Sequence, residues 1–276
     1  MSIEADFALL ESLLLARGPG GQEEEVRAVC RRELEASCDE VWMDAADNLV
    51  GVIRAAGVSR ETAQSRAIRV MAHQDEIAMV VKRIAEDGRL HVVALGGAFP
   101  VNFGMCPVDV MGETDVLPGV LSFGTMHGTS ESPQSAHILS GNVQWADVHV
   151  ITRRTQAELV EMGVRPGSRV VLSQHWRRPF RVNDAIAAHF LDDRAPVVAA
   201  LRAAEQLAQL RFTHLLDVAA IQQRIRDLDD TVRPLAVADA VEHDGMHCAI
   251  GIVCVARHAP CVTIRMEQLP HHRLPL

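Results

Sequence analysis

Two short polar clusters in the chain carry side chains of the kinds that bind divalent metal ions. The first is His73-Gln74-Asp75, which directly follows the apolar run 67–72. Residues i and i+2 of an extended segment face the same side, so His73 and Asp75 can converge on one site. A metal-bound histidine usually needs a carboxylate or carbonyl partner that fixes its tautomer, and Asp75 could supply it. On its own, however, the triplet is better explained as a polar surface turn.

The second cluster is Asp192-Asp193-Arg194, at the start of the helical stretch 195–210. Acidic residues at this point can cap the N-terminus of a helix, and this explanation is sufficient for Asp193. The functional alternative is that Asp192 bridges two metal ions. Hard divalent cations at close spacing favour an oxygen ligand that can serve both of them. Arg194 could then orient the other carboxylate.

The elements that must position these residues can be read from apolar spacing. Helical periodicity predicts helices over 3–17 and 22–36, with Gly18-Pro19-Gly20-Gly21 as the turn between them. The run 67–72 predicts a buried central strand. His73 then follows the carboxyl end of this strand, where open α/β sheets place their ligands.

The sequence changes in character between residues 79 and 182. Short β-like runs are separated there by Gly, Pro and polar turns, and one helical piece at 155–162 interrupts them. Several short strands in about a hundred residues predict a small barrel or sandwich. Because apolar spacing typical of helices returns after this region, we expect a β-domain (79–182) inserted into an α/β domain (1–78 plus 183–276).

Composition limits the classes of function that are open to the chain. Of the 276 residues, 48% are hydrophobic and 23% are charged, which indicates a packed core and argues against global disorder. The net charge of −9 argues against nucleic-acid binding. The N-terminal segment is an amphipathic helix with acidic residues, unlike a signal peptide, and no stretch approaches the roughly 20 apolar residues that span a bilayer. We therefore expect a cytoplasmic protein that binds no membrane, with reduced cysteines.

Residues 66–95 resemble the core of the tetrahedral, deblocking and glutamyl aminopeptidases, which are dinuclear metallo-exopeptidases. That family has a strand, then His-x-Asp-Glu-Ile-Gly, then a hairpin that ends in Gly-Gly; the counterparts here are His73–Ala78 and Gly96-Gly97. Further matches follow in the same order as in the family: Pro19–Val26, Asp44–Leu49, Gly163–Gly167 and Leu191–Arg194. The resemblance covers roughly residues 8–210, and the combination is much more specific than any single motif.

The resemblance implies a three-layer α/β catalytic domain and an inserted β-barrel-like domain through which the protein forms homo-oligomers. It also implies two divalent ions (Zn, Co or Mn) that activate a water molecule, which removes N-terminal residues from short peptides. In this scheme His73 binds one ion, Asp192 bridges both, and Asp75 lies behind His73 in the catalytic machinery. His258, in a His-x-Pro sequence, corresponds to the family's last histidine ligand.

The resemblance weakens towards the C-terminus. The family has a Glu-Glu pair after its Asp-Asp-Arg, which supplies the general base and one ligand, and the nearest counterparts here are Gln223 and Arg224. Glutamine cannot accept a proton at useful pH, and arginine cannot bind a cation. Our first hypothesis, from the ordered set of motifs, is a metal-dependent aminopeptidase. Because the Glu-Glu pair is missing, our second is an inactive relative that acts as an assembly or binding subunit, or the product of a damaged gene. A serine or cysteine hydrolase is disfavoured because Gly-x-Ser-x-Gly is absent and no Cys lies in a recognisable triad context.

Overall fold

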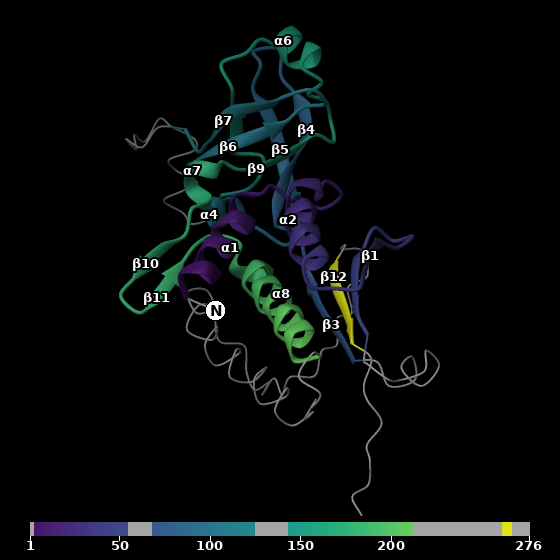
Figure 1. The fold of residues 1–276 in the computed structure, drawn as a ribbon. Coiled ribbons are helices and arrows are strands. Elements are labelled where there is room, and N and C mark those ends of the chain that lie inside the picture. Colours follow the sequence, from purple (N-terminus) through teal and green to yellow (C-terminus); the bar gives the residue numbers. More distant parts are fainter. Residues whose placement is uncertain (1–2, 55–67, 125–142, 212–260, 267–276) are drawn as a thin grey trace, which may run out of the picture. The chain divides into compact units, whose positions relative to one another are not determined.

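A computed structural model describes residues 3–54, 68–124, 143–211 and 261–266 (Figure 1). The chain divides into two compact units, 1–75 with 179–276 and 76–178. The first border between the units follows Asp75, whereas the sequence-based division placed it after residue 78. The second border follows Arg178, whereas the sequence-based division placed it after residue 182. Within the described residues, no helix is long and apolar enough to cross a membrane.

The first unit is built on a four-stranded sheet against which helices pack. The strand order is β1 (Glu40–Met43), β2 (Leu49–Ile53), β12 (Cys261–Met266) and β3 (Ile68–His73). β12 runs parallel to β2 and antiparallel to β3, so it joins two strands from the N-terminal part of the chain. β10 (Phe180–Val182) and β11 (Ala185–Ala187) form a separate hairpin.

The helices of this unit are α1 (Ile3–Leu15), α2 (Glu24–Glu35) and α8 (Leu191–Arg211), as far as the described residues show. α2 and α8 contact each other and both pack against the sheet, and α1 packs against both helices. α1 and α2 confirm the two helices expected at 3–17 and 22–36. An α/β architecture is thus present, while the expected third layer is not seen in the described part of the chain.

Apolar side chains at regular spacing bury the contact between helices and sheet. On α2 the buried positions are Val26, Cys30 and Leu34, four residues apart, which is the repeat of one helix face. β2 is buried along its whole length. β3 was expected as a buried central strand. Among the four strands that the structure describes it lies at one edge, and only Ala72 in it is buried.

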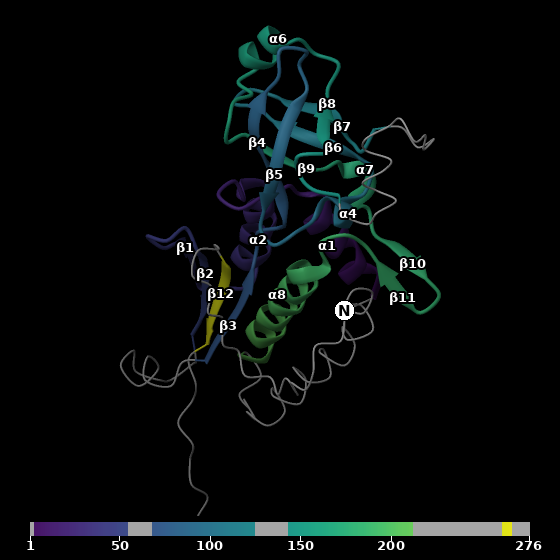
Figure 2. The same cartoon turned by 180° about the vertical axis from the view of Figure 1, so that it is seen from behind.

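The second unit is a closed six-stranded barrel, which confirms the barrel expected from the short β-like runs (Figure 2). Its strand order is β4 (Ala78–Ile84), β5 (Leu90–Leu95), β8 (His149–Ile151), β7 (Val116–Ser122), β6 (Cys106–Met111) and β9 (Arg169–Leu172). Three short helices accompany the described strands: α4 (Pro100–Phe103), α6 (Gln156–Glu161) and α7 (Gln174–Arg177). Valines dominate the buried positions of these strands, as expected for pleated, buried segments.

A buried ion pair links the two ends of the barrel unit. Glu76 begins this unit and Arg177 lies one residue before its end. Their side chains are both 0% exposed, and the Arg177 guanidinium donates a hydrogen bond to the Glu76 carboxylate. A charge buried in this way requires a charged or hydrogen-bonding partner, so each residue depends on the other.

Candidate metal centre

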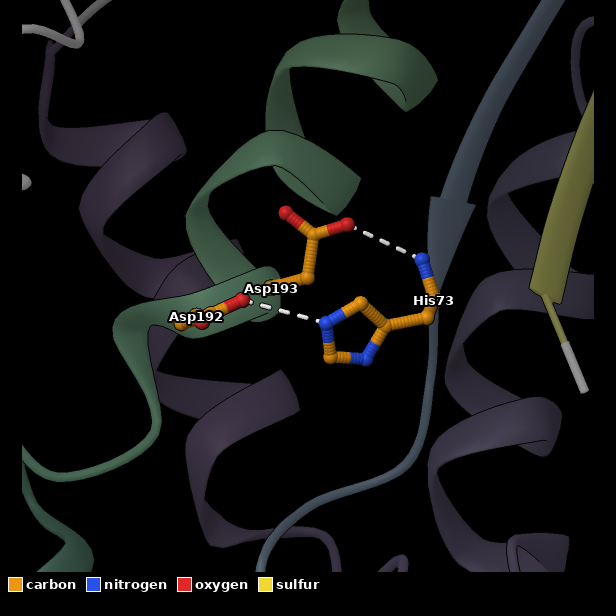
Figure 3. A group of neighbouring side chains, drawn as sticks. All are labelled: His73, Asp192 and Asp193. Carbon is orange, nitrogen blue, oxygen red and sulfur yellow. Dashed lines mark hydrogen bonds and ion pairs between the residues drawn. The ribbon is translucent and has the colours of Figure 1, made fainter. Parts of the chain in front are cut away.

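His73 and the acidic pair at the start of α8 face each other in the first unit (Figure 3). His73 is the last residue of β3, and α8 packs against that strand. The backbone of Asp192 (φ −85°, ψ 107°) and of Asp193 (φ −115°, ψ 24°) is not helical. The regular helix therefore begins after these two residues, and both side chains turn towards His73 from the end of a helix.

Three carboxylates contact His73. Oδ1 of Asp75 lies 3.1 Å from Nδ1 of the imidazole, and Oδ1 of Asp192 lies 3.0 Å from Nε2. Oδ2 of Asp193 accepts a hydrogen bond of 2.9 Å from the backbone N–H of His73. Both ring nitrogens and the backbone of His73 are thus fixed by acidic side chains.

The same groups fit a divalent metal ion. Ligand atoms of His73, Asp192 and Asp193 all lie within 4.8 Å of one another, and imidazole nitrogen with carboxylate oxygen is a common ligand set for zinc and similar ions. The side chain of Asp192 is 94% exposed, so an ion from solvent can reach it. Asp75, on the other ring nitrogen, occupies the position of the carboxylate that usually fixes a ligating histidine.

The acidic surroundings change the protonation of the site. Hydrogen bonds to Asp192 and then to Asp75 raise the pKa of His73 to about 10, and the His73 imidazole lowers the pKa of Asp192. Burial raises the pKa of Asp193 to about 6. A metal ion that binds His73 must therefore displace a proton, so metal binding and pH are coupled at this site.

The structure brings together three of the residues singled out from the sequence and adds one. His73, Asp75 and Asp192 meet as described, and their roles as ligand, orienting carboxylate and bridge stay predictions. Asp193 was assigned only to capping, but its carboxylate holds the backbone of His73. Its adjacency to Asp192 was the available signal. His258, Gln223 and Arg224 lie outside the described residues.

The model of the M42 glutamyl aminopeptidase family matches residues 52–222, which is more than half of the chain. The chain belongs to this family. The matched range contains His73, Asp75, Asp192 and Asp193, and it confirms the resemblance drawn from the sequence motifs. Membership of the M42 family makes the chain a relative of hydrolases of the aminopeptidase class.

Relatives of this M42 chain include named and putative aminopeptidases. It is 25% identical over 222 residues to the lysyl aminopeptidase of Pyrococcus furiosus, which is 80% of this chain and 60% of that protein. It is also 25% identical over 211 residues to the putative aminopeptidase SgcX of Escherichia coli, at 76% of this chain and 52% of that protein. The chain thus spans between half and two thirds of the length of these relatives.

Solved structures share the fold of this M42 chain. The aminopeptidase APDkam598 from Desulfurococcus kamchatkensis superimposes with a TM-score of 0.57 at 21% identity, over 74% of this chain and 52% of that one. The TET1 peptidase of Pyrococcus horikoshii gives the same TM-score at 21% identity, over 75% of this chain and 57% of that one. That peptidase can assemble into a tetrahedron or a large octahedral shell.

Proposed function

We propose that the chain is a metal-dependent aminopeptidase that removes N-terminal residues from short peptides with two bound divalent ions, zinc, cobalt or manganese. The observation that carries the proposal is the convergence of His73, Asp192 and Asp193 within 4.8 Å, with Asp75 on the second ring nitrogen of His73. This donor set fits a divalent cation, and family membership supports peptide hydrolysis as its use.

Each acidic residue around His73 has a separate role in the proposed metal site. Asp75 accepts the Nδ1–H of His73, which leaves the lone pair of Nε2 for an ion. Asp192, whose carboxylate lies beside Nε2, would hold an ion together with His73, in the role of the proposed bridge. Asp193 keeps the backbone of His73 in place. When bound there, the ions would supply Lewis acidity for the scissile carbonyl and for a water molecule.

The substrate and the assembly are inferred from relatives. A lysyl aminopeptidase among them supports short peptides as substrates, and the shells of the Pyrococcus horikoshii peptidase support a homo-oligomer that forms through the barrel unit. We place the protein in the cytoplasm, where peptides from protein degradation are available. The inactive-subunit alternative rests on Gln223 and Arg224, and relatives described as aminopeptidases do not favour it.

The test measures metal per chain by elemental analysis after dialysis against zinc. We expect close to two ions in the natural chain and a clear loss in His73→Ala. His175→Ala is the matched control, because His175 is an exposed histidine on α7 in the other unit. Hydrolysis of aminoacyl p-nitroanilides should then depend on the same metal. A natural chain that retains no zinc would refute the proposal.

A further inference from the structure

The turn between α1 and α2 lies directly against the buried side chain of Arg194. Arg194 follows Asp193 in sequence and is fully buried. A Cβ atom built on Gly18 would lie 2.7 Å from Nη2 of Arg194 and 2.8 Å from Cγ1 of Val26. Real Cβ atoms essentially never approach other atoms this closely, so only glycine lets the turn close onto the guanidinium.

Gly18 also contacts the end of the strand that carries the site. The same Cβ would lie 3.2 Å from the backbone oxygen of Gln74, the residue between His73 and Asp75. Three distant segments of the chain therefore meet at one glycine: the α1–α2 turn, the end of β3 and the start of α8. All three belong to the first unit.

The turn is a fixed surface with its own internal hydrogen bonds. The backbone N–H of Gly21 donates to Oε1 of Glu23 at 2.6 Å, and that of Gln22 donates to the oxygen of Pro19 at 2.8 Å. Glu23 is itself only 2% exposed and pairs with Arg27 at 3.4 Å. A turn held in this way can act as a template for the groups that pack on it.

The start of α8 needs such a template. Asp192 and Asp193 have non-helical backbone, so the regular helix does not fix them. The next residue is Arg194, whose charged side chain is fully buried and is therefore costly to move away from its surroundings. Arg194 is bonded directly to Asp193, whose carboxylate accepts a hydrogen bond of 2.9 Å from the backbone N–H of His73.

We propose that Gly18 is a positioning residue of the candidate metal centre. It lets the α1–α2 turn close over Arg194, and the seated Arg194 holds Asp192 and Asp193 against His73. The effect on metal binding rests on the proposed function, whereas the effect on the contacts of His73 belongs to the metal-free protein. The two parts can therefore be measured separately.

The first measurement is hydrogen exchange of the His73 backbone amide in the metal-free full chain, followed in peptides that cover residues 70–76. We expect exchange at least about tenfold faster in Gly18→Ala, because the hydrogen bond to Asp193 is displaced. Gly51→Ala is the matched control. A Cβ on Gly51 would lie 2.7 Å from Sγ of Cys38, the same shortest distance as at Gly18, in the same unit and without involving Arg194 or His73.

The second measurement is zinc affinity by competition with a chromophoric chelator. We expect about a tenfold loss in Gly18→Ala, the size typical for residues that orient metal ligands. Arg194→Lys in the Gly18→Ala background should restore part of this loss, because lysine has no Nη2 atom to meet the added methyl group. A double-mutant cycle then gives a coupling between the two positions. If Gly18→Ala does not fold, the exchange of the His73 amide and the zinc affinity are measured on Arg194→Lys alone.

Either of two results would overturn the role of Gly18. One is unchanged exchange of the His73 amide in a folded Gly18→Ala protein. The other is equal acceleration in Gly18→Ala and Gly51→Ala, which would indicate a general loss of packing. A natural chain that binds no zinc would instead refute the proposed function, and the exchange data would still decide whether Gly18 positions His73.

Discussion

The four consecutive residues His73-Gln74-Asp75-Glu76 belong to two regions in which charged side chains are arranged in opposite ways. In the candidate metal centre, His73 and Asp75 meet the exposed Asp192, and acids outnumber bases. In the barrel unit, the fully buried side chains of Glu76 and Arg177 form a pair of opposite charges. Excess negative charge near solvent is suited to recruiting a cation, whereas a closed pair is suited to holding a structure. One polar motif can therefore carry both tasks.

The largest effect should come from the buried pair. Arg177→Met removes the guanidinium that pairs with the buried carboxylate of Glu76, so the free energy of unfolding should fall by about 3–5 kcal/mol. Urea denaturation measures this change. Zinc affinity should stay at the natural value under conditions in which the protein is still folded. A loss of zinc binding without loss of stability would show that the two regions are not separable.

Changes at the metal centre should show the opposite pattern. Asp192→Ala should lower zinc affinity by about a hundredfold and Asp75→Asn by about tenfold, because one residue is a proposed ligand and the other orients one. Stability of the metal-free chain should fall less in Asp192→Ala than in Arg177→Met, since the Asp192 side chain is 94% exposed. Isothermal titration and urea denaturation of the same samples test both statements. Equal zinc affinities in the two variants would contradict the assigned roles.

The smallest effect is the dependence of stability and zinc affinity on pH that His73 contributes. The pKa of His73 is raised to about 10 in the folded, metal-free chain, above its ordinary value of 6.5. The stability that the protonated imidazole contributes is thus present below about pH 6.5 and is lost as the pH rises towards 10. Apparent zinc affinity should rise over the same range, because fewer protons must be displaced. Zinc titrations from pH 6 to 9 test this, and a flat profile would count against His73 as a ligand.

Local features of the sequence were sufficient for the elements and for part of the site. The helices at 3–17 and 22–36 and the barrel strands follow from apolar periodicity and turn residues. The convergence of His73 and Asp75 follows from the alternation of side chains along a strand. The edge position of β3 among the described strands was not predictable, because it depends on pairing with β12, which comes from the far end of the chain.

The remaining features depend on approaches between distant segments. The contact of Asp193 with His73 spans 120 positions in the sequence, and it needs the non-helical start of α8. The pair of Glu76 with Arg177 spans 101 positions. The turn at Gly18 was predicted as a turn, but its approach to Arg194 follows only from how the segments pack. Spacing patterns identify such residues as polar and do not say which partner they meet.

The pairing of Glu76 with Arg177 makes the barrel a cassette whose two ends are clamped together. For the α/β unit, such an insert costs little more loop-closure entropy than a short loop, because entropy rises only slowly with the length of the intervening chain. We therefore expect that the loop-closure entropy of the host would change little if the barrel were exchanged for another insert with paired ends. Recombination between genes could vary this cassette and leave the neighbouring His73 and Asp75 in place.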